Sequence, residues 1–177
     1  MIIYFFNIEL VSALNNIGHL YCNGCGVEKD YLKAKEYYEK SFNPGNLDAL
    51  VCLGDLYLNG YGVEKSFSKA KELYEKSFQL GNINALVSIG NIYLNGNGVK
   101  INYSKAKKYY EKAVKLGDPS ALIDIGKMYD NGLGVKMDKY EEQSCYKESH
   151  RLGNHSAACY IIERSPFIGM TFTIYPS

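Results

Sequence analysis

The sequence LGDLYLNGYGVEKSFSKAKELYEKSFQLG, residues 53–81, decides the fold of this chain because it recurs at a fixed interval. Shifted forward by 36 residues it returns as IGNIYLNGNGVKINYSKAKKYYEKAVKLG at 89–117, and shifted back by 36 as IGHLYCNGCGVEKDYLKAKEYYEKSFNPG at 17–45. A weaker copy occupies 125–153. A period of this size is typical of solenoids, whose small units bury their apolar faces only by stacking on their neighbours.

Net charge, cysteine content and the apolar N-terminal stretch argue against several classes of function. The 177 residues carry a net charge of +1, which provides no long-range attraction to nucleic acid or anionic lipid. Five cysteines at irregular spacing do not resemble a disulfide framework, so we expect reduced thiols and a cytoplasmic location. The apolar start MIIYFFNIELVSAL is interrupted by Glu9 and has no basic residue before Lys29, which predicts neither a signal peptide nor a membrane span.

Each copy begins with an apolar helical pattern. In the second copy Ala49, Leu53, Gly54 and Tyr57 share one helix face at spacings of three and four. A glycine inside a helix costs about 1 kcal/mol relative to alanine. The glycine nevertheless recurs at one register in all four copies, at Gly18, Gly54, Gly90 and Gly126. We therefore expect a neighbouring helix to approach so closely there that any side chain would collide with it.

A turn and a second helix complete each copy. The first helix ends at Asn-Gly, where a glycine readily adopts the left-handed conformation that ends a helix. The second helix is predicted to begin after a capping residue, which is Asp30, Ser66 or Asn102 in the first three copies. Ala70, Tyr74 and Ser77 then fall at i, i+4 and i+7, on one buried face.

These motifs resemble the Sel-one-like repeat (SLR), a relative of the tetratricopeptide repeat, over about residues 13–158. The resemblance rests on LG-x-x-Y, NG-x-GV and a KA-x-x-x-Y-x-K-[SA] run that ends in glycine. It implies an all-α fold, a right-handed α/α superhelical solenoid of about four helix-turn-helix repeats of 36 residues. It also implies an adaptor or scaffold that binds a partner protein.

The ends of the array depart from the pattern. Glu142 replaces the alanine of the second helix in the fourth copy, which suggests a solvent-facing last helix. The tail alternates apolar residues at the period of a strand, and we expect it to be disordered or extended. The predicted segments are 1–9 (partial cap or remnant of a preceding repeat), 10–45, 46–81, 82–117 and 118–153 (repeats 1 to 4), 154–165 (capping helix) and 166–177 (tail).

The first helices of such a superhelix line its concave side, so partner-binding residues are expected on their face opposite the core. Residues at these positions differ between copies, whereas core residues stay the same. A line of valine and isoleucine flanked by differing polar groups could hold an extended peptide or a helix, although a mixed, solvated face with partly covered valines is an equal alternative. The candidate residues are Asn15, His19, Val51, Asp55, Val87, Asn91, Ile123 and Lys127.

The sequence gives little support for phosphate binding, metal binding or catalysis. The repeated G-x-G follows a helix rather than a strand, unlike a phosphate-binding loop. His19, Cys22 and Cys25 have metal-ligand residue types but lack a second pair of ligands, so no metal and no cofactor are expected. Cysteine-rich relatives proposed to bind penicillin-like compounds offer an alternative function, but they carry a regular disulfide in each unit. We predict a non-catalytic scaffold that binds neither nucleic acid nor membrane.

Overall fold

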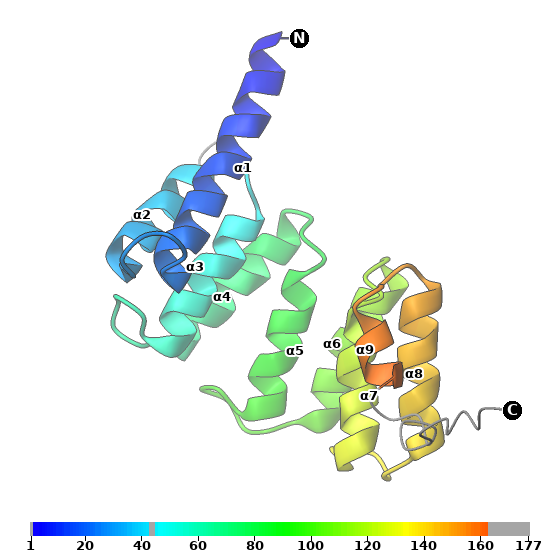
Figure 1. The fold of residues 1–177 in the computed structure, drawn as a ribbon. Helices are drawn as coiled ribbons and strands as arrows, with labels where there is room; N and C mark the ends of the chain where they lie inside the picture. The colour runs from blue at the N-terminus through cyan, green and yellow to red at the C-terminus, as the bar shows by residue number, and fades with distance from the viewer. Residues whose placement is uncertain (1, 43–44, 163–177) are drawn as a thin grey trace, which may run out of the picture. The chain divides into compact units, whose positions relative to one another are not determined.

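The computed structural model describes residues 2–42 and 45–162, and within these ranges the chain is helical without strands (Figure 1). The all-α repeat architecture predicted from the sequence is therefore confirmed. The helices are α1 (Ile2–Asn23), α2 (Tyr31–Phe42), α3 (Asp48–Asn59), α4 (Phe67–Gln79), α5 (Ala85–Asn95), α6 (Tyr103–Lys115), α7 (Ala121–Asn131), α8 (Lys139–Arg151) and α9 (Ala157–Ile162).

The chain forms two compact units, and each is described by itself. Unit 1 comprises Met1–Tyr109 and unit 2 comprises Tyr110–Ser177, so the boundary falls within α6. Within unit 1, α1 packs on α2 and α3 packs on α4 as antiparallel hairpins, and α2 contacts α3 while α4 contacts α5. Within unit 2, α7 and α8 form a hairpin that α9 covers. Successive elements thus stack in chain order inside each unit.

A glycine–tyrosine contact recurs in the hairpins α1–α2, α3–α4 and α7–α8. A methyl group added at Gly54 would lie 2.4 Å from Cε1 of Tyr74, and at Gly18 it would lie 2.5 Å from the ring of Tyr38. The predicted collision is confirmed, and the colliding group is the tyrosine of the second helix in the same hairpin. The contact recurs in unit 2 between Gly126 and Tyr146. The helical glycine is therefore required because the tyrosine ring fills the space beside it.

A buried serine on α2, α4 and α8 bonds to the backbone on the first-helix side of its hairpin, whereas α6 has Ala113 at this register. The hydroxyl of Ser77 donates to the carbonyl oxygen of Leu47 at 2.8 Å, just before α3 begins. Ser41 donates to the carbonyl of Val11 at 2.9 Å in the same way. Ser41 and Ser77 are both 0% exposed, so their hydroxyl groups need a partner within the protein, and these carbonyl oxygens provide one.

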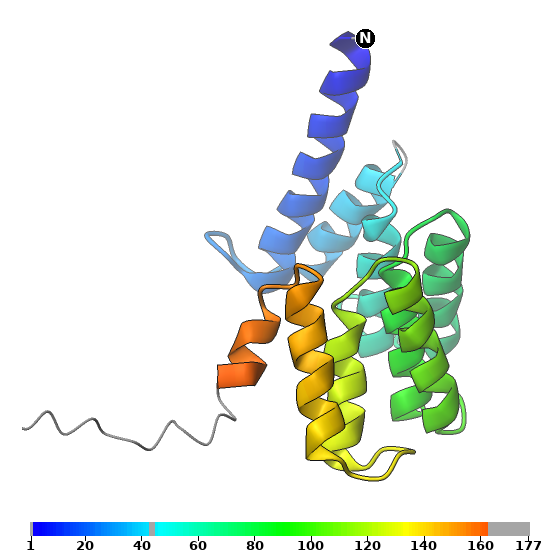
Figure 2. The same cartoon turned by 90° about the vertical axis from the view of Figure 1, so that its right-hand side faces the viewer.

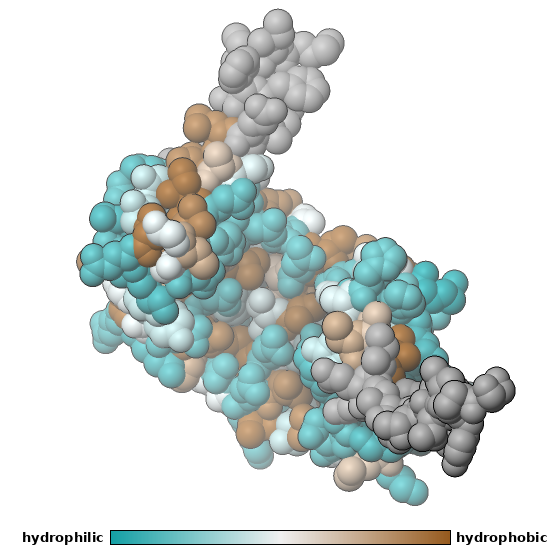
Figure 3. Space-filling view, in the orientation of Figure 1, coloured by the Kyte–Doolittle hydropathy of each residue, from teal (hydrophilic) through white to brown (hydrophobic). Residues whose placement is uncertain are grey.

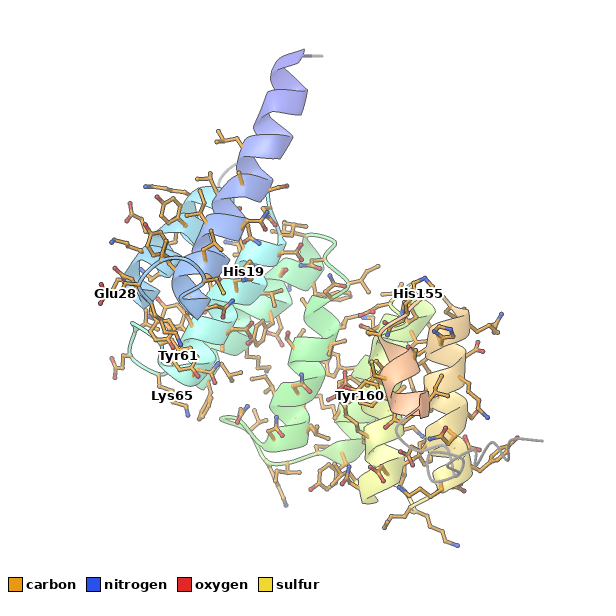
Figure 4. The ribbon with its side chains drawn as sticks, in the orientation of Figure 1. His19, Glu28, Tyr61, Lys65, His155 and Tyr160 are labelled. Atoms are coloured by element: carbon orange, nitrogen blue, oxygen red, sulfur yellow. The ribbon has the colours of Figure 1, made fainter. Side chains whose placement is uncertain are left out.

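The predicted turns and caps are confirmed. Gly60 has φ of 74°, and its N–H donates to the carbonyl of Leu56 at 2.8 Å, which ends α3 in the left-handed conformation. The N–H of Lys69 donates to Ser66 Oγ at 3.3 Å and caps α4. The second glycine of the turn, Gly62, lies against the start of α2 in the preceding repeat. Figure 4 shows Glu28, Tyr61 and Lys65 at this end of the hairpins.

The ends of the array show what a repeat pattern cannot predict. Helix α1 is continuous from Ile2 to Asn23, so no helix end marks the predicted boundary between residues 9 and 10 (Figure 2). The expectation for Glu142 is wrong: its side chain is buried at 0% exposure, with Lys139 Nζ 3.1 Å from its Oε2. Helix α9 (Ala157–Ile162) lies within the segment 154–165 predicted as a capping helix, and the tail at 166–177 lies outside the described residues.

Candidate partner-binding surface

The predicted partner-binding residues of unit 1 lie on α1, α3 and α5, the first helices of three repeats. Their positions share one helix face, which leaves Val51, Val87 and Asn91 half-buried and His19 and Asp55 with exposed edges. Neighbouring residues on these helices, such as Leu53 and Leu56, are buried in the core. Of the predicted residues in unit 1, Asn15 alone is buried among the described side chains. Figure 3 shows polar and apolar patches interleaved over this unit.

In the first two repeats the core tyrosine reaches through the hairpin to a residue of this accessible face. The hydroxyl of Tyr74 donates to Asp55 Oδ1 at 2.6 Å. In the preceding repeat Tyr38 Oη lies 3.2 Å from His19 Nδ1, and the two rings pack edge to face with centroids 5.4 Å apart. A residue that stays the same in all copies thus holds a residue that differs between them. The repeat pattern assigns the tyrosines to the core alone and gives no sign of this second contact.

The residues around His19 form a small polar cluster at the junction of the first two repeats (Figure 4). Asn15 Nδ2 lies 3.3 Å from His19 Nε2, and Cys52 Sγ on α3 lies 3.7 Å from the same nitrogen. Asn15 is only 8% exposed, so it supports His19 from below rather than forming part of the surface. Cys52 is not among the predicted candidates, although its register on α3 already placed it on the accessible face.

Burial raises the pKa of several acidic groups in and beside this cluster. Removal from water raises the pKa of Asp55, against the lowering effect of the Tyr74 hydroxyl and of His19. Although part of the Asp55 side chain is exposed, protein atoms surround its carboxylate, and their removal of water raises the pKa. Burial, followed by Asp55 and Asp48, raises the pKa of the Cys52 thiol to about 12. Burial also raises the pKa of Tyr38 and Tyr74 well above the usual range. Cys52 therefore lacks the thiolate character of a catalytic cysteine.

The two candidates in unit 2 behave differently from each other. Ile123 is only 8% exposed and packs with Tyr146 and Ala157, so it does not extend an accessible apolar line as predicted. The physical reason is that α9 covers this part of α7. Lys127 is exposed, with its Nζ 3.3 Å from Asp124 Oδ1 and 5.5 Å from the ring centroid of Tyr160. It places a positive charge on the exposed side of α7.

The structure gives no metal-binding arrangement to the residues it describes. Among residues 2–42 and 45–162, no three His, Cys, Asp or Glu side chains come together as ligands of one ion would. His19 contacts Tyr38 and Cys52, and Cys25 is exposed in the turn after α1. All five cysteines lie within the described part of the chain and are free thiols. None of the helices described there has the length and apolar content that crossing a membrane requires.

Comparison with known proteins identifies the family. The model of the Sel1 repeat matches residues 11–43, 48–82, 83–118 and 119–141, which is most of the chain. The chain belongs to the Sel1 repeat family. Proteins with this repeat fold are typically protein-interaction scaffolds, and they generally bind protein partners without catalysis of their own. A search of curated proteins found no match.

Solved structures of Sel1 repeat proteins resemble the chain. A Sel1 repeat protein from Oxalobacter formigenes is 29% identical with a TM-score of 0.66, and the match covers 86% of this chain and 62% of that one. Immunity protein Pa5087 from Pseudomonas aeruginosa is 27% identical with a TM-score of 0.61, covering 84% and 55%. Cysteine rich protein B from Helicobacter pylori is 26% identical with a TM-score of 0.51, covering 78% and 99%. The chain thus spans less than two thirds of the first two relatives.

Proposed function

We propose that this chain is a non-catalytic scaffold that binds a segment of a partner protein on the accessible face of its first helices. In unit 1 the surface consists of His19, Val51, Asp55, Val87 and Asn91, with Asn15 supporting His19 from within. In unit 2 Lys127 offers a positive charge. The buried Ile123 anchors α9 and is not part of the contact surface.

One observation supports this proposal: in the first two hairpins the recurring tyrosine contacts a side chain that varies from copy to copy, and so fixes its orientation. Tyr74 holds Asp55, and Tyr38 contacts His19. A side chain held in place before binding loses less conformational entropy when a partner arrives. The repeats thereby present different polar groups in fixed positions, which is what selective recognition of one peptide sequence requires.

The chemistry of the surface defines the partner segment. Asp55 accepts hydrogen bonds and carries the negative charge of this region, so it favours a Lys or Arg side chain on the partner. The half-buried Val51 and Val87 favour an apolar residue on the same partner segment, beside its basic residue. We expect an extended segment with a basic residue and an apolar residue at matching spacing.

Selection of peptides from a displayed random library against the intact chain tests the proposal. The affinity of a selected peptide for the wild type would then be compared with its affinity for Asp55→Lys. We expect about a tenfold weaker complex, since a like charge replaces an attractive one at the contact. The matched control is Glu72→Lys, which makes the same charge change on the exposed face of α4. Equal binding to both variants would contradict the proposed surface.

The alternative function as a penicillin-type binder or hydrolase is not supported by a specific feature of the structure. It was tied to a regular disulfide in each repeat, and all five cysteines here are free thiols. The raised pKa of Cys52 also argues against a nucleophile in the His19 cluster.

A further inference from the structure

Two pockets of unit 1 lie at the same register in successive repeats. The pocket of repeat 1 has a volume of about 430 Å³, and that of repeat 2 about 400 Å³. Every residue that lines the first pocket, from Tyr21 to Lys33, has its counterpart 36 positions later in the lining of the second, from Tyr57 to Lys69. Lys35 of the preceding repeat also lines the second pocket. The pocket is therefore a recurring feature of the repeat.

A lysine of the second helix lies over the tyrosine ring in each of these pockets. Lys33 Nζ is 5.2 Å from the ring centroid of Tyr21, and Lys69 Nζ is 5.0 Å from that of Tyr57. The face of an aromatic ring attracts a cation. The ring therefore holds the ammonium group at the pocket, although both lysines are exposed.

The residue that caps the second helix decides whether this lysine is neutralised. In repeat 1 the cap is Asp30, whose Oδ2 lies 3.5 Å from Lys33 Nζ. In repeat 2 the cap is the uncharged Ser66. Lys69 has its ring contact there and no carboxylate partner in the described part of the chain. The two pockets thus share their shape but differ in charge.

Lysines outnumber carboxylates in the pocket of repeat 2. Lys35, Lys65 and Lys69 line it beside a single acidic residue, Glu64. Lys35 is paired with Glu39, with Nζ 3.0 Å from Oε1. Lys65, at the turn that Figure 4 labels, lies over a phenylalanine ring at 4.8 Å and, like Lys69, has no carboxylate partner among the described residues. Two ammonium groups are therefore available to an anion at this pocket.

Repeat 3 keeps the tyrosine–lysine contact, again with an uncharged cap. Lys105 Nζ lies 4.1 Å from the ring centroid of Tyr93, and Lys71 Nζ of the preceding repeat, which also pairs with Glu75, lies 5.9 Å from it. The cap is Asn102, which accepts a hydrogen bond from the N–H of Lys105 at 2.9 Å. The Lys105 ammonium lowers the pKa of the Tyr93 phenol, although burial opposes this effect. Positive charge thus gathers at the same register in two successive repeats.

We propose that the tyrosine–lysine sites of repeats 2 and 3 bind anionic side chains of a partner protein, with Lys69 and Lys105 as the principal contacts. The shared chemistry is that of a carboxylate or a phosphate group, each of which forms charge-assisted hydrogen bonds with an ammonium group. An anion gains these bonds without displacing a carboxylate from either lysine. Glu64 at the pocket and the net charge of +1 disfavour the continuous phosphates of nucleic acid.

This proposal is independent of the peptide surface around His19 and Asp55, because none of its residues belongs to that surface. Fluorescence anisotropy with labelled decapeptides at low salt tests it, since salt screens exposed charges. Decaglutamate supplies carboxylates, a decamer of alternating serine and phosphoserine supplies phosphates, and a decamer of alternating serine and glycine is the neutral control. We expect the intact chain to bind at least one anionic peptide more tightly than the neutral one, and the tighter of the two identifies the anion.

Two variants locate the binding at the pocket. Ser66→Asp rebuilds the arrangement of repeat 1, in which an aspartate neutralises the lysine, and should weaken binding about tenfold. It should fold, because aspartate already caps α2 and α8 at this register. Lys69→Gln leaves the cap intact and should weaken binding about fivefold. The control is Ser144→Asp, which makes the same change of one charge unit on the exposed side of α8.

Helix content by circular dichroism checks that the variants keep the fold, and Lys69→Gln serves as the test if Ser66→Asp does not. An intact chain that binds both anionic peptides no more tightly than the neutral decamer would overturn the proposal. Ser66→Asp and Lys69→Gln that bind as tightly as Ser144→Asp would overturn it equally, since the attraction would then come from the overall charge of the chain.

Discussion

Replacement of Gly54 by alanine tests the physical basis of the repeat, because two effects of opposite sign compete at this position. Alanine favours the helix by about 1 kcal/mol relative to glycine. The added methyl group, however, would lie 2.4 Å from Cε1 and 2.8 Å from Cδ1 of Tyr74. That ring is 1% exposed, and its hydroxyl is held by Asp55, so it has little freedom to move aside. Overpacking of a core costs about 1–3 kcal/mol, and a contact this short belongs at the upper end.

The two effects leave Gly54→Ala about 2 kcal/mol less stable than the wild type. Urea unfolding followed by circular dichroism measures the difference, with the slope m compared between variants to check that the cooperativity is unchanged. Ser68→Ala, an exposed substitution on α4 of the same hairpin, should change stability by less than about 0.5 kcal/mol. The cost of Gly54→Ala should fall below about 1 kcal/mol when Tyr74→Leu makes room beside it.

A Gly54→Ala variant as stable as the wild type, or more stable, would refute the reasoning. Helix propensity would then dominate, and the recurrence of this glycine could not be explained by the tyrosine ring. An undiminished cost in the Tyr74→Leu background would also count against it, because the penalty would have to come from another neighbour.

Three further predictions follow from the same contacts. Tyr74→Phe should lower the free energy of unfolding by about 1 kcal/mol, because Asp55 loses its hydrogen-bond donor. Tyr146→Phe should leave it unchanged or raise it, since the buried Tyr146 hydroxyl has no hydrogen-bond partner in the described part of the chain. Urea unfolding of the two variants measures the difference. The pKa of Asp55 is raised above 3.8 in the folded protein, so the folded state binds the proton more tightly than the unfolded state. The contribution of Asp55 to stability is therefore lost as the pH rises from below 3.8 through the pKa of the folded state. Asp55→Asn should remove this pH dependence from unfolding midpoints measured over a pH series. Cys52, whose pKa is raised from 9.0 to about 12, should alkylate far more slowly at neutral pH than the exposed Cys25, as peptide mass spectrometry would show; equal rates would contradict the burial of Cys52.

Features that depend on one repeat and its neighbours could be predicted from the sequence. The glycine that ends α3 and the cap at Ser66 are local, and the contact of Gly54 with Tyr74 lies within one hairpin. Each of these recurs, so a comparison of the copies shows which residue types the fold requires. The register of Asp55 could be recognised in the same way as one that the core leaves free to vary, because its residue differs between the copies.

Features at the ends of each stack could not be predicted, because a repeat assigns one environment to each register. Ile123 occupies the register of the half-buried Val51 and Val87, yet it is buried against α9. Glu142 occupies the register of buried alanines and is buried as well, against the expectation from its charge. Leu20 shows the reverse effect, since it keeps a core residue type in an exposed place. Burial at the ends follows from which neighbour is present, and a register carries no information about that.

The tyrosine of the second helix links the part of the repeat that must stay constant to the part that can vary. Its ring requires glycine on the first helix, and its buried hydroxyl requires a hydrogen-bond partner one position further along that helix, as Asp55 follows Gly54. Asp55 meets this need, and His19 lies within reach of Tyr38. Lys127 cannot accept a hydrogen bond and contacts Asp124 instead, which leaves Tyr146 without that partner in the described part of the chain. The core therefore limits which residues can occupy the position of Asp55 in each repeat. A residue that accepts a hydrogen bond satisfies the tyrosine hydroxyl, whereas a residue that cannot accept one leaves that hydroxyl unpaired and makes the hairpin less stable.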